Sequence, residues 1–340
     1  MCTTKNILIA FGVSLISLSY CNSQVWSDYS EDKKPLYNEM MKLIGNVPKD
    51  KKDFTHLMRL HQGWWRTFVL LEKSGQHPSK PSETVCNTIT NGEKTQKNFL
   101  TTNSYKAYAK TIQNNLDKSQ MIEEKRAVNN LLSSQPLCFN AFGEMAINLD
   151  LATAFLKTLF PDVKEVKEVL FEFRPDGYSY DKSAFDVAFI FTTTDSQKAL
   201  WGFEVKYTDS FSPVAKNRKE YFQVFTKNKD HFLCEFESYQ TVEMNELFRN
   251  ELIARWCENS GNVDKAYTGI FCHHDDTATI SAAKHFQKTL KDGVNKFRIL
   301  TYSDLLTALQ KLDLTWEQRK WTFLFWARYC GTELSEEIRK

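Results

Sequence analysis

AFDVAFIFT (residues 184–192) and ALWGFEVKY (residues 199–207) are two short, strongly apolar stretches that are rich in aromatic and β-branched residues. Stretches of this length and composition are typical of buried β-strands. Asp195-Ser196 lies between them and is typical of a turn. We therefore predict an antiparallel hairpin, and this hairpin decides the fold class.

The residues on both sides of the hairpin alternate between helical and strand patterns. We predict further strands at 163–173, 265–272 and 297–301, and helices at 142–160, 242–257 and 279–290. The order is helix, three strands, helix, strand, helix, strand. That order predicts an α/β domain with a mixed central sheet flanked by helices, which we place at 136–310.

The remainder of the chain is predicted to be helical. Helical spacing predicts helices at 36–43, 56–71, 98–116 and 122–132, so residues 36–135 form a helical N-terminal region. Gly75, Pro78 and Pro81 predict a loop over Glu72–Glu83. Helical patterns at 305–312 and 317–329 end the chain, and 311–340 is a C-terminal helical segment.

The composition is that of an ordinary globular protein, and it excludes one class of nucleic-acid binder. The 340 residues include 44 Lys+Arg and 42 Asp+Glu, which give a net charge of +2. This balance excludes a polybasic, histone-like protein whose whole surface binds nucleic acid. A local basic patch remains compatible with it.

The cysteines and the N-terminus give opposite indications about the compartment. None of the 8 cysteines forms a Cys-x-x-Cys pair, and most have apolar neighbours, which favours free, buried cysteine in a reducing compartment. Residues 1–24 contain Lys5, an apolar run and then a polar stretch, which is typical of a secretory signal. An upstream start codon or a terminal core helix is the alternative. We favour the bacterial cytoplasm slightly, with export through residues 1–23 as the rival.

Charged residues occupy both hairpin strands at positions where burial is expected. Asp186 lies in the first strand, and Glu204 and Lys206, two apart and so on one face, lie in the second. The hairpin lets Asp186 approach Glu204, and a divalent ion shared by the two offsets the cost of burying them. Oxygen ligands favour Mg²⁺ over zinc. An ordinary salt bridge on a half-exposed sheet is the alternative.

This spacing resembles the PD-(D/E)XK nuclease superfamily, which has the restriction-endonuclease-like fold. Its signature is an Asp on the second core strand followed by (Asp/Glu)-x-Lys on the third. This chain has Asp186 and then Glu204-Val205-Lys206, although no proline precedes the Asp.

A longer set of residues resembles an uncharacterised bacterial branch of restriction-type endonucleases. The set comprises NLLSSQPLCFN at 130–140, SAFD at 183–186, His61-Gln62 with Trp65-Arg66, and Asn98-Phe99-Leu100. The resemblance covers residues 56–310 and leaves 1–30 unexplained.

The resemblance implies a role for each residue of the signature. Asp186 and Glu204 would bind Mg²⁺, with Mn²⁺ as a substitute, and the Val205 carbonyl would be a third ligand. Lys206 would orient or help to deprotonate the attacking water and would offset charge on the phosphate. The ion would stabilise the transition state and lower the pKa of the water.

Two more acids are secondary catalytic candidates. Glu144 lies early in the predicted helix 142–160, where related nucleases often place an outer metal ligand; a solvated acid at a helix start is the alternative. Glu172 lies near the end of the predicted strand 163–173. It either completes the acidic cluster or pairs with Arg174.

Three other patterns have weaker functional interpretations. His273-His274-Asp275-Asp276 suggests a metal site, but its spacing matches no zinc motif, so a loop after a strand is favoured. Trp64-Trp65-Arg66 suggests base stacking, yet Trp64 lies on the apolar face of a predicted helix, which favours core packing. Five basic residues that follow the strand 199–207 could contact phosphates or could belong to a solvated loop: Lys216, Arg218, Lys219, Lys227 and Lys229.

The sequence as a whole predicts a Mg²⁺-dependent endonuclease that hydrolyses DNA, of the restriction type. A repair nuclease, a secreted scavenging nuclease and a DNA-binding relative without cleavage are the alternatives. DNA is the expected partner. A homodimer and a protective methyltransferase or other partner are further expectations.

Overall fold

The structure is a computed structural model that describes residues 34–114 and 122–338. The signal-like segment predicted at 1–24 lies outside these residues. Among the described helices, none combines the length and the apolar character that crossing a membrane requires.

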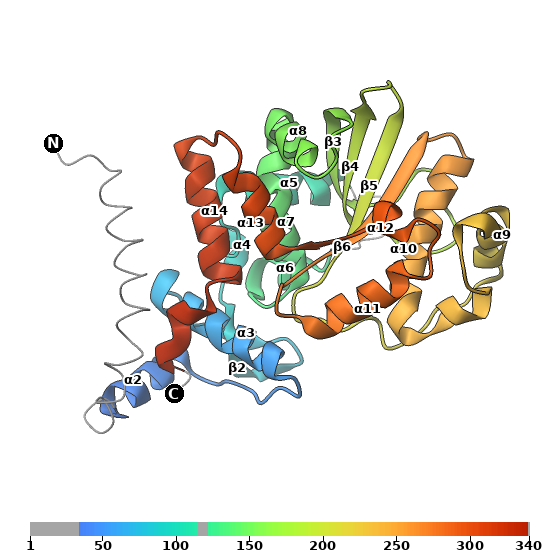
Figure 1. Cartoon of the computed structure of the whole chain (residues 1–340). Helices are drawn as coiled ribbons and strands as arrows, with labels where there is room; N and C mark the ends of the chain where they lie inside the picture. Colours follow the sequence, from blue (N-terminus) through green and yellow to red (C-terminus); the bar gives the residue numbers. More distant parts are fainter. Residues whose placement is uncertain (1–33, 115–121, 339–340) are drawn as a thin grey trace, which may run out of the picture.

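A five-stranded mixed sheet lies at the centre of the molecule, in the order β3-β4-β5-β6-β7 (Figure 1). Its strands are β3 (Val163–Phe173), β4 (Phe185–Thr193), β5 (Lys198–Val205), β6 (Lys265–Cys272) and β7 (Phe297–Thr301). The β3–β4 and β4–β5 pairs are antiparallel, whereas the β5–β6 and β6–β7 pairs are parallel. The mixed sheet and the predicted hairpin, which is β4–β5, are both confirmed.

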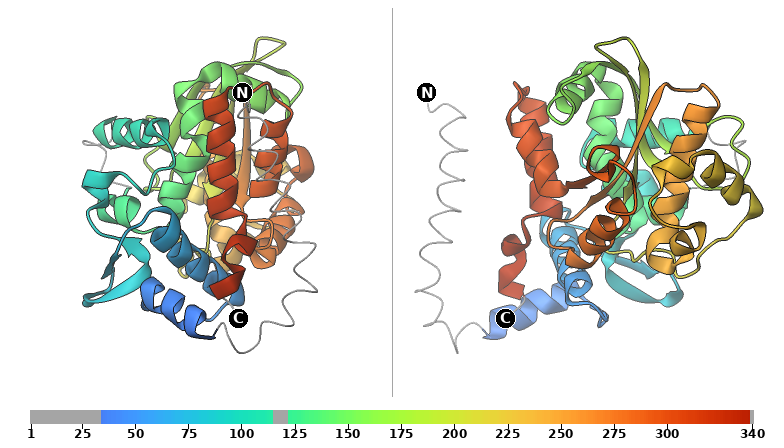
Figure 2. Two further views of the ribbon diagram at one scale, coloured as in Figure 1. Left: turned by 90° about the vertical axis from the view of Figure 1, so that its left-hand side faces the viewer. Right: turned by 45° about the vertical axis from the view of Figure 1, so that its right-hand side comes forward.

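Helices cover both faces of the sheet (Figure 2). One face packs against α5 (Thr102–Asn114), α7 (Ser134–Ile147), α8 (Leu149–Lys157), α13 (Tyr302–Gln310) and α14 (Trp316–Tyr329). The other face packs against α10 (Val242–Asn259), with α9 (Lys219–Lys227), α11 (Thr277–Gln287), α12 (Gly293–Lys296) and two 3-10 turns, Lys229–His231 and Phe236–Gln240, beside it.

Strand alternation decides which side chains enter which layer. Val187 and Phe189 of β4 are buried with α7, whereas Ala188 and Ile190 are buried with α10. Burying each Phe side chain contributes roughly 1.5–3 kcal/mol. The alternation breaks at the start of β4, where Phe185 lies in the α10 layer with Ala188.

The N-terminal region contains helices and one hairpin, so the predicted loop over Glu72–Glu83 is wrong. The helices are α2 (Lys34–Ile44), α3 (Asp53–Trp64), which continues as a π-helical turn (Trp65–Val69), α4 (Gly92–Thr95) and α6 (Glu124–Asn129). In place of the loop, β1 (Ser74–His77) pairs antiparallel with β2 (Lys80–Ile89). Gly75 is buried inside β1, Pro78 lies in the turn and Pro81 on the exposed half of β2, while Val85 and Ile89 are buried.

The single helix predicted over 142–160 is also wrong. The structure has two helices, which meet at Asn148. The Asn148 side chain accepts a hydrogen bond from the Leu151 N–H at 3.0 Å and so caps the start of α8. An N-cap residue has extended backbone geometry, and this is what separates α7 from α8.

Buried hydrogen bonds fasten the N-terminal region to α14, and several residues of the resemblance have this structural role. The Arg328 guanidinium donates to the Asn98 carbonyl oxygen at 2.8 Å and to the Gln62 Oε1 at 3.2 Å. The Gln62 amide in turn donates to the Tyr207 hydroxyl at 2.7 Å. These contacts hold the chain directly after Lys206. The last 3-10 segment, Thr332–Ile338, packs on α3 through His61 and Ser335.

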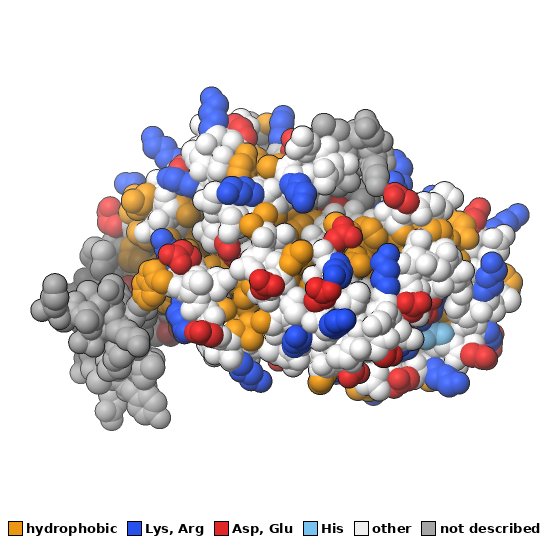
Figure 3. Space-filling view, turned by 90° about the horizontal axis from the view of Figure 1, so that it is seen from above, with side chains coloured by type: hydrophobic (Ala, Val, Ile, Leu, Met, Phe, Trp, Pro, Cys, Tyr) orange, Lys and Arg blue, Asp and Glu red, His pale blue; other side chains and the backbone are white. Residues whose placement is uncertain are grey.

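The surface charges are mixed. On the face seen in Figure 3, Lys and Arg side chains alternate with Asp and Glu side chains. This agrees with the small net charge of +2.

Candidate active site

Strand register aligns three acidic residues across the sheet. Phe171 pairs with Val187 and Phe173 with Phe185, so Glu172 lies opposite Asp186. Val187 pairs with Phe203, so Asp186 in turn lies opposite Glu204. The Glu204 carboxylate adds to burial in raising the pKa of both Glu172 and Asp186, so the three carboxyl groups lie near one another. We call Glu172, Asp186 and Glu204 the acid row.

Asp186 is the central member of the acid row. Its Oδ2 accepts a hydrogen bond from the Val205 N–H at 2.7 Å, which fixes the carboxyl group against β5. Burial and the neighbouring Glu204 carboxylate raise the pKa of Asp186 well above its ordinary value. A buried carboxyl group of this kind gives up its proton readily only when a cation replaces it.

Glu204 is held by two neighbours of different charge. Its Oε1 lies 3.0 Å from the Lys206 Nζ, and its Oε2 accepts a hydrogen bond from the Asn250 amide at 2.9 Å. Glu204 and Lys206 are both buried. The two residues share a face of β5, as the Glu-x-Lys spacing predicts.

Both the side chain and the backbone of Lys206 are fixed by neighbouring residues. Its Nζ lies 2.9 Å from the Glu246 Oε2 and over the Phe211 ring. Its backbone N–H donates to the Phe271 carbonyl oxygen at 2.8 Å, and its carbonyl oxygen accepts from the Tyr302 hydroxyl at 2.6 Å. Burial alone would lower the pKa of Lys206, but Glu204 and Glu246 outweigh burial and raise it. The side chain is therefore an ammonium ion at neutral pH.

Glu172 occupies a strained position at the free edge of the sheet. Its φ is +48°, in the left-handed region, which costs a non-glycine residue on the order of 1–2 kcal/mol. Burial and the Glu204 carboxylate raise the pKa of Glu172 to about 7, and a hydrogen bond with Gln135 of α7 opposes them. Strain at a half-buried acid next to two others is a sign of function rather than of stability.

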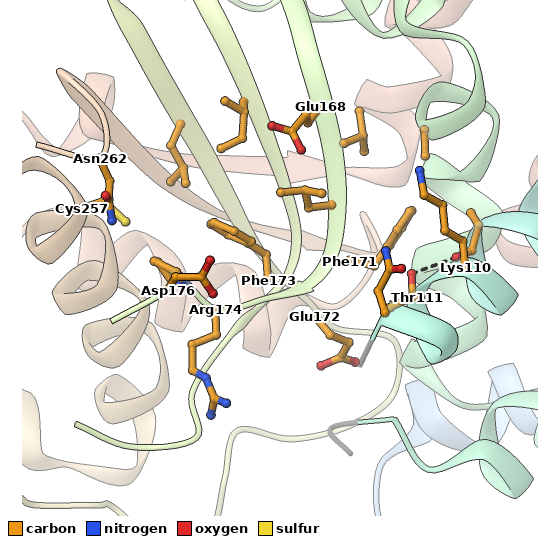
Figure 4. A pocket seen from close by; sticks show the side chains of 18 of the residues that line it. Lys110, Thr111, Glu168, Phe171, Glu172, Phe173, Arg174, Asp176, Cys257 and Asn262 are labelled. Carbon is orange, nitrogen blue, oxygen red and sulfur yellow. Dashed lines mark hydrogen bonds between the residues drawn. The ribbon is translucent and has the colours of Figure 1, made fainter. Parts of the chain in front are cut away.

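A cavity of about 450 Å³ runs along β3 and reaches the acid row at Glu172 (Figure 4). Lys110 and Thr111 line one side of it, and Asp176 and Asn262 line the other. Arg174 also lines the cavity, but among the described residues it forms no ion pair with Glu172. The structure thus favours the acidic-cluster interpretation of Glu172 over its pairing with Arg174.

The structure does not bring Glu144 into the acid row. Glu144 lies near the C-terminal end of α7, where its Oε2 accepts a hydrogen bond from the Asn103 amide at 2.9 Å. Cys138, whose thiol donates to the Asp186 carbonyl oxygen, lies six positions earlier, about 9 Å away along the helix axis. Gln135, in the first turn of α7, bonds to the side chain of an acid of the row, Glu172.

Three residues of the site were missed by the sequence analysis. Gln135 comes from α7, and Glu246 and Asn250 come from α10. Glu246 and Asn250 are four positions apart, so they share a helical face, and this was the available signal. No sequence pattern predicts that this face packs against Glu204 and Lys206, because the contact is formed only when the helix packs on the sheet.

The acid row has the chemistry of a site for a hard divalent cation. The three carboxyl groups of the acid row lie close together in a largely buried place, and the Lys206 ammonium pairs with Glu204 alone of the three. Such an excess of negative charge is costly unless it is protonated or neutralised. All the side-chain donors are oxygen atoms, which suit a hard divalent cation.

The residues His273-His274-Asp275-Asp276 form the turn between β6 and α11, so the predicted loop is confirmed. Ligand atoms of the first three lie within 4.8 Å of one another. The two imidazole rings are stacked, however, with an interplanar angle of 22°, so their in-plane lone pairs run side by side and do not converge. Asp276 caps α11 by accepting from the Thr279 N–H. This arrangement favours a structural turn.

The other two weak candidates divide between core and surface. Trp65 and Arg66 are buried, and the Arg66 guanidinium donates to backbone carbonyl oxygens, so the core interpretation is favoured for this motif. Of the basic group, Lys229 pairs with Glu235 at 2.8 Å. Lys216 and Arg218 are exposed between β5 and α9, and Lys219 is the exposed first residue of α9.

We predict that Glu172→Gln makes the metal-free protein more stable at alkaline pH. The Glu172 pKa is raised from 4.5 to about 7 by folding, so its favourable contribution is complete below pH 4.5 and is lost as the pH rises through 7. The loss is roughly 3 kcal/mol in the wild type and is absent in the variant. Urea unfolding in EDTA at pH 5 and pH 8 measures it.

The control for this prediction is Glu168→Gln, because Glu168 is an exposed acid on the same strand. This variant should retain the wild-type pH dependence. Parallel pH profiles for wild type and Glu172→Gln would contradict the placement of Glu172 in the acid row.

Comparison with known proteins identifies a family for most of the chain. A family model for the PD-(D/E)XK nuclease superfamily matches residues 48–331. Neither the curated proteins nor the solved structures yield a match. The matched region contains the whole sheet and every residue of the acid row.

Proposed function

The chain belongs to the PD-(D/E)XK nuclease superfamily, and from this premise we propose that it is a metal-dependent endonuclease that hydrolyses phosphodiester bonds of DNA. The observation that carries the proposal is the acid row with Lys206 beside it. Asp186, Glu204 and Lys206 are the catalytic residues in this proposal. They are also the residues that match the Asp and Glu-x-Lys signature of the superfamily.

In this proposal Asp186 and Glu204 hold the ion, Mg²⁺ or Mn²⁺, together with the Val205 carbonyl. The Val205 N–H already orients the Asp186 carboxyl group at 2.7 Å, so the two acids need little rearrangement. A bound ion supplies Lewis-acid stabilisation of the phosphorane-like transition state and a more acidic water molecule. Metal binding must displace protons from the row, because burial raises the pKa of Asp186.

Lys206 and Glu172 are assigned complementary roles around the phosphate. The Lys206 ammonium, which is fixed at both its backbone and its Nζ, orients the attacking water and offsets charge that develops on the phosphate. Glu172, with a pKa of about 7, is matched to accept a proton near neutral pH. An intact set of acids and lysine favours cleavage over DNA binding alone.

The segment between β5 and α9 is proposed to contact the DNA backbone. Lys216 and Arg218 are exposed there, Lys219 is the exposed first residue of α9, and the segment begins directly after Lys206. The Asn245 side chain bonds to the Lys216 backbone at both its N–H and its carbonyl oxygen, so the basic residues are tied to α10. Cationic side chains at this position would bring phosphates to the acid row.

The test is cleavage of a linear DNA duplex closed by a hairpin at each end. An endonuclease with Mg²⁺ cuts this substrate, whereas an enzyme that needs a free end does not. Discrete fragments would support the restriction type, and a continuous smear would favour a scavenging nuclease. Complete resistance of the substrate, with degradation of the same duplex left open-ended, would overturn the endonuclease proposal.

The biological setting follows from the fragment pattern. Discrete cutting in the cytoplasm requires protection of the host genome, which we propose to come from a methyltransferase or another partner. Cutting both strands at one site is accomplished most simply by a homodimer with two acid rows. Fractionation of cells that produce the tagged chain tests the proposed cytoplasmic location.

A further inference from the structure

Helix α10 supplies an acid that contacts the catalytic lysine. The Glu246 Oε2 lies 2.9 Å from the Lys206 Nζ and accepts a hydrogen bond from the Ser212 N–H at 3.2 Å. The side chain of Glu246 is 18% exposed and that of Lys206 only 7%. The ion pair is therefore largely shielded from water, where such a pair is much stronger than on a surface.

Lys206 is shared between two carboxylates that have different tasks. Glu204 lies 3.0 Å from the ammonium and is also a proposed ligand of the divalent ion. A carboxylate that gives electron density to a divalent cation holds an ammonium less strongly. Glu246 contacts the same ammonium from helix α10, and its side chain also forms a hydrogen bond with the Glu204 carboxyl group.

The fold holds Glu246 rigidly. Its neighbours Met244 and Leu247 are buried in the core between α10 and the sheet, so the helix cannot rotate without losing packing. Asn245 and Glu246 both bond to the segment after β5, at Lys216 and Ser212. One helical turn thus fixes the lysine and the backbone that follows it.

The charge state of Glu246 agrees with this arrangement. Burial alone would raise the pKa of Glu246, but the Lys206 ammonium, the Ser212 N–H and a hydrogen bond with the Glu204 carboxyl group outweigh burial and lower it. The residue is an anion at neutral pH.

We propose that Glu246 is a positioning residue, which holds the Lys206 ammonium in place for catalysis while Glu204 serves the divalent ion. The inference rests on the proposed function, because it assumes that Lys206 acts on the phosphate or on the attacking water. Glu246 acts through Lys206 and does not touch the reacting atoms. The role is distinct from that of the acid row, whose members face one another across the strands.

The test compares Glu246→Gln with the matched control Glu243→Gln. The glutamine keeps the size of the side chain and an acceptor for the Ser212 N–H, but it removes the charge opposite Lys206. Glu243 is an exposed acid one turn earlier on the same helix. Glu246→Asp, which retains the charge on a shorter side chain, is the conservative variant.

The first measurement is steady-state cleavage with Mg²⁺. Glu246→Gln should lower kcat by roughly 10- to 100-fold, the effect of losing a charge-assisted hydrogen bond. KM for DNA should stay within about 2-fold, Glu246→Asp should recover part of kcat, and Glu243→Gln should match the wild type. A wild-type kcat for Glu246→Gln, or a fall in KM and kcat shared with the control, would overturn the proposal.

The second measurement does not require nuclease activity. The folded protein is treated with an amine-reactive ester, and mass spectrometry follows the rate at which Lys206 is labelled. This rate should rise several-fold in Glu246→Gln and stay unchanged in Glu243→Gln. Equal labelling of Lys206 in all the proteins would overturn the positioning role. If the wild type cleaves no DNA but the labelling differs as expected, the proposed function is wrong, whereas the positioning of Lys206 by Glu246 is supported.

Discussion

Replacement of Asp186 by asparagine is expected to abolish cleavage while leaving the fold intact. Asparagine keeps an oxygen that accepts from the Val205 N–H, so the hairpin geometry is preserved. It removes the charge at the centre of the acid row, and with it most of the affinity for a divalent ion. The expected loss is about 10³-fold or more in kcat, which corresponds to about 4 kcal/mol of transition-state stabilisation.

The same variant should be at least as stable as the wild type in the absence of metal. Burial raises the pKa of Asp186, so ionisation of this group at neutral pH lowers the free energy of unfolding. Asparagine has no charge to bury. Thermal unfolding in EDTA at pH 7.5 tests this expectation. The added increase in Tm on Mn²⁺ binding should be present in the wild type and lost in Asp186→Asn. A variant that retains both cleavage and the metal-dependent Tm shift would exclude Asp186 as a ligand.

Lys206→Ala is expected to abolish cleavage and to leave DNA binding. The ammonium is the cationic group that lies among Glu204 and Glu246 in the described site, and general acid–base or electrostatic catalysis of this kind contributes typically 10²- to 10⁴-fold. DNA affinity depends on the many exposed basic residues and should change little. Fluorescence anisotropy in Ca²⁺ measures the binding, and single-turnover cleavage in Mg²⁺ measures the chemistry.

Stability must be monitored in the lysine experiment. Removing one partner of a buried ion pair leaves its acids uncompensated, at a cost of about 3–5 kcal/mol. The assays therefore belong well below the Tm of the variant, with Lys206→Met as a second variant that retains side-chain volume. Turnover at the wild-type rate in either variant would refute the assigned role of Lys206.

Strand prediction succeeded where burial dominates the sequence pattern. The three strands predicted at 163–173, 265–272 and 297–301 are β3, β6 and β7 with the same bounds. β6 and β7 are short segments with mostly apolar side chains, whereas β3 has 11 residues and is recognisable by its buried valines and apolar end. β2 was missed because Pro81 and an exposed first half hide the buried second half of the strand.

The acid row was partly predictable, for a simple geometric reason. Period-two alternation along a hairpin places Asp186 and Glu204 on one face, and the register then sets them opposite each other. Glu144 was expected near the start of its helix, but α7 begins at Ser134, eight positions before the predicted start at Phe142. Glu144 therefore lies in the last turn of α7, and Gln135, in the first turn, is the residue that bonds to Glu172. Glu246 depends on the packing of α10, which a single sequence does not specify.

The central claim is that the acid row is a metal-dependent centre for phosphodiester hydrolysis. The most direct measurement incubates supercoiled plasmid with the purified full-length chain in Mg²⁺ and, in parallel, in EDTA, with Asp186→Asn alongside. We predict that the wild type converts the plasmid to nicked and linear forms in Mg²⁺ alone and that the variant leaves it supercoiled in both. Equal cleavage by the wild type and Asp186→Asn, or cleavage by the wild type that persists in EDTA, would contradict the account.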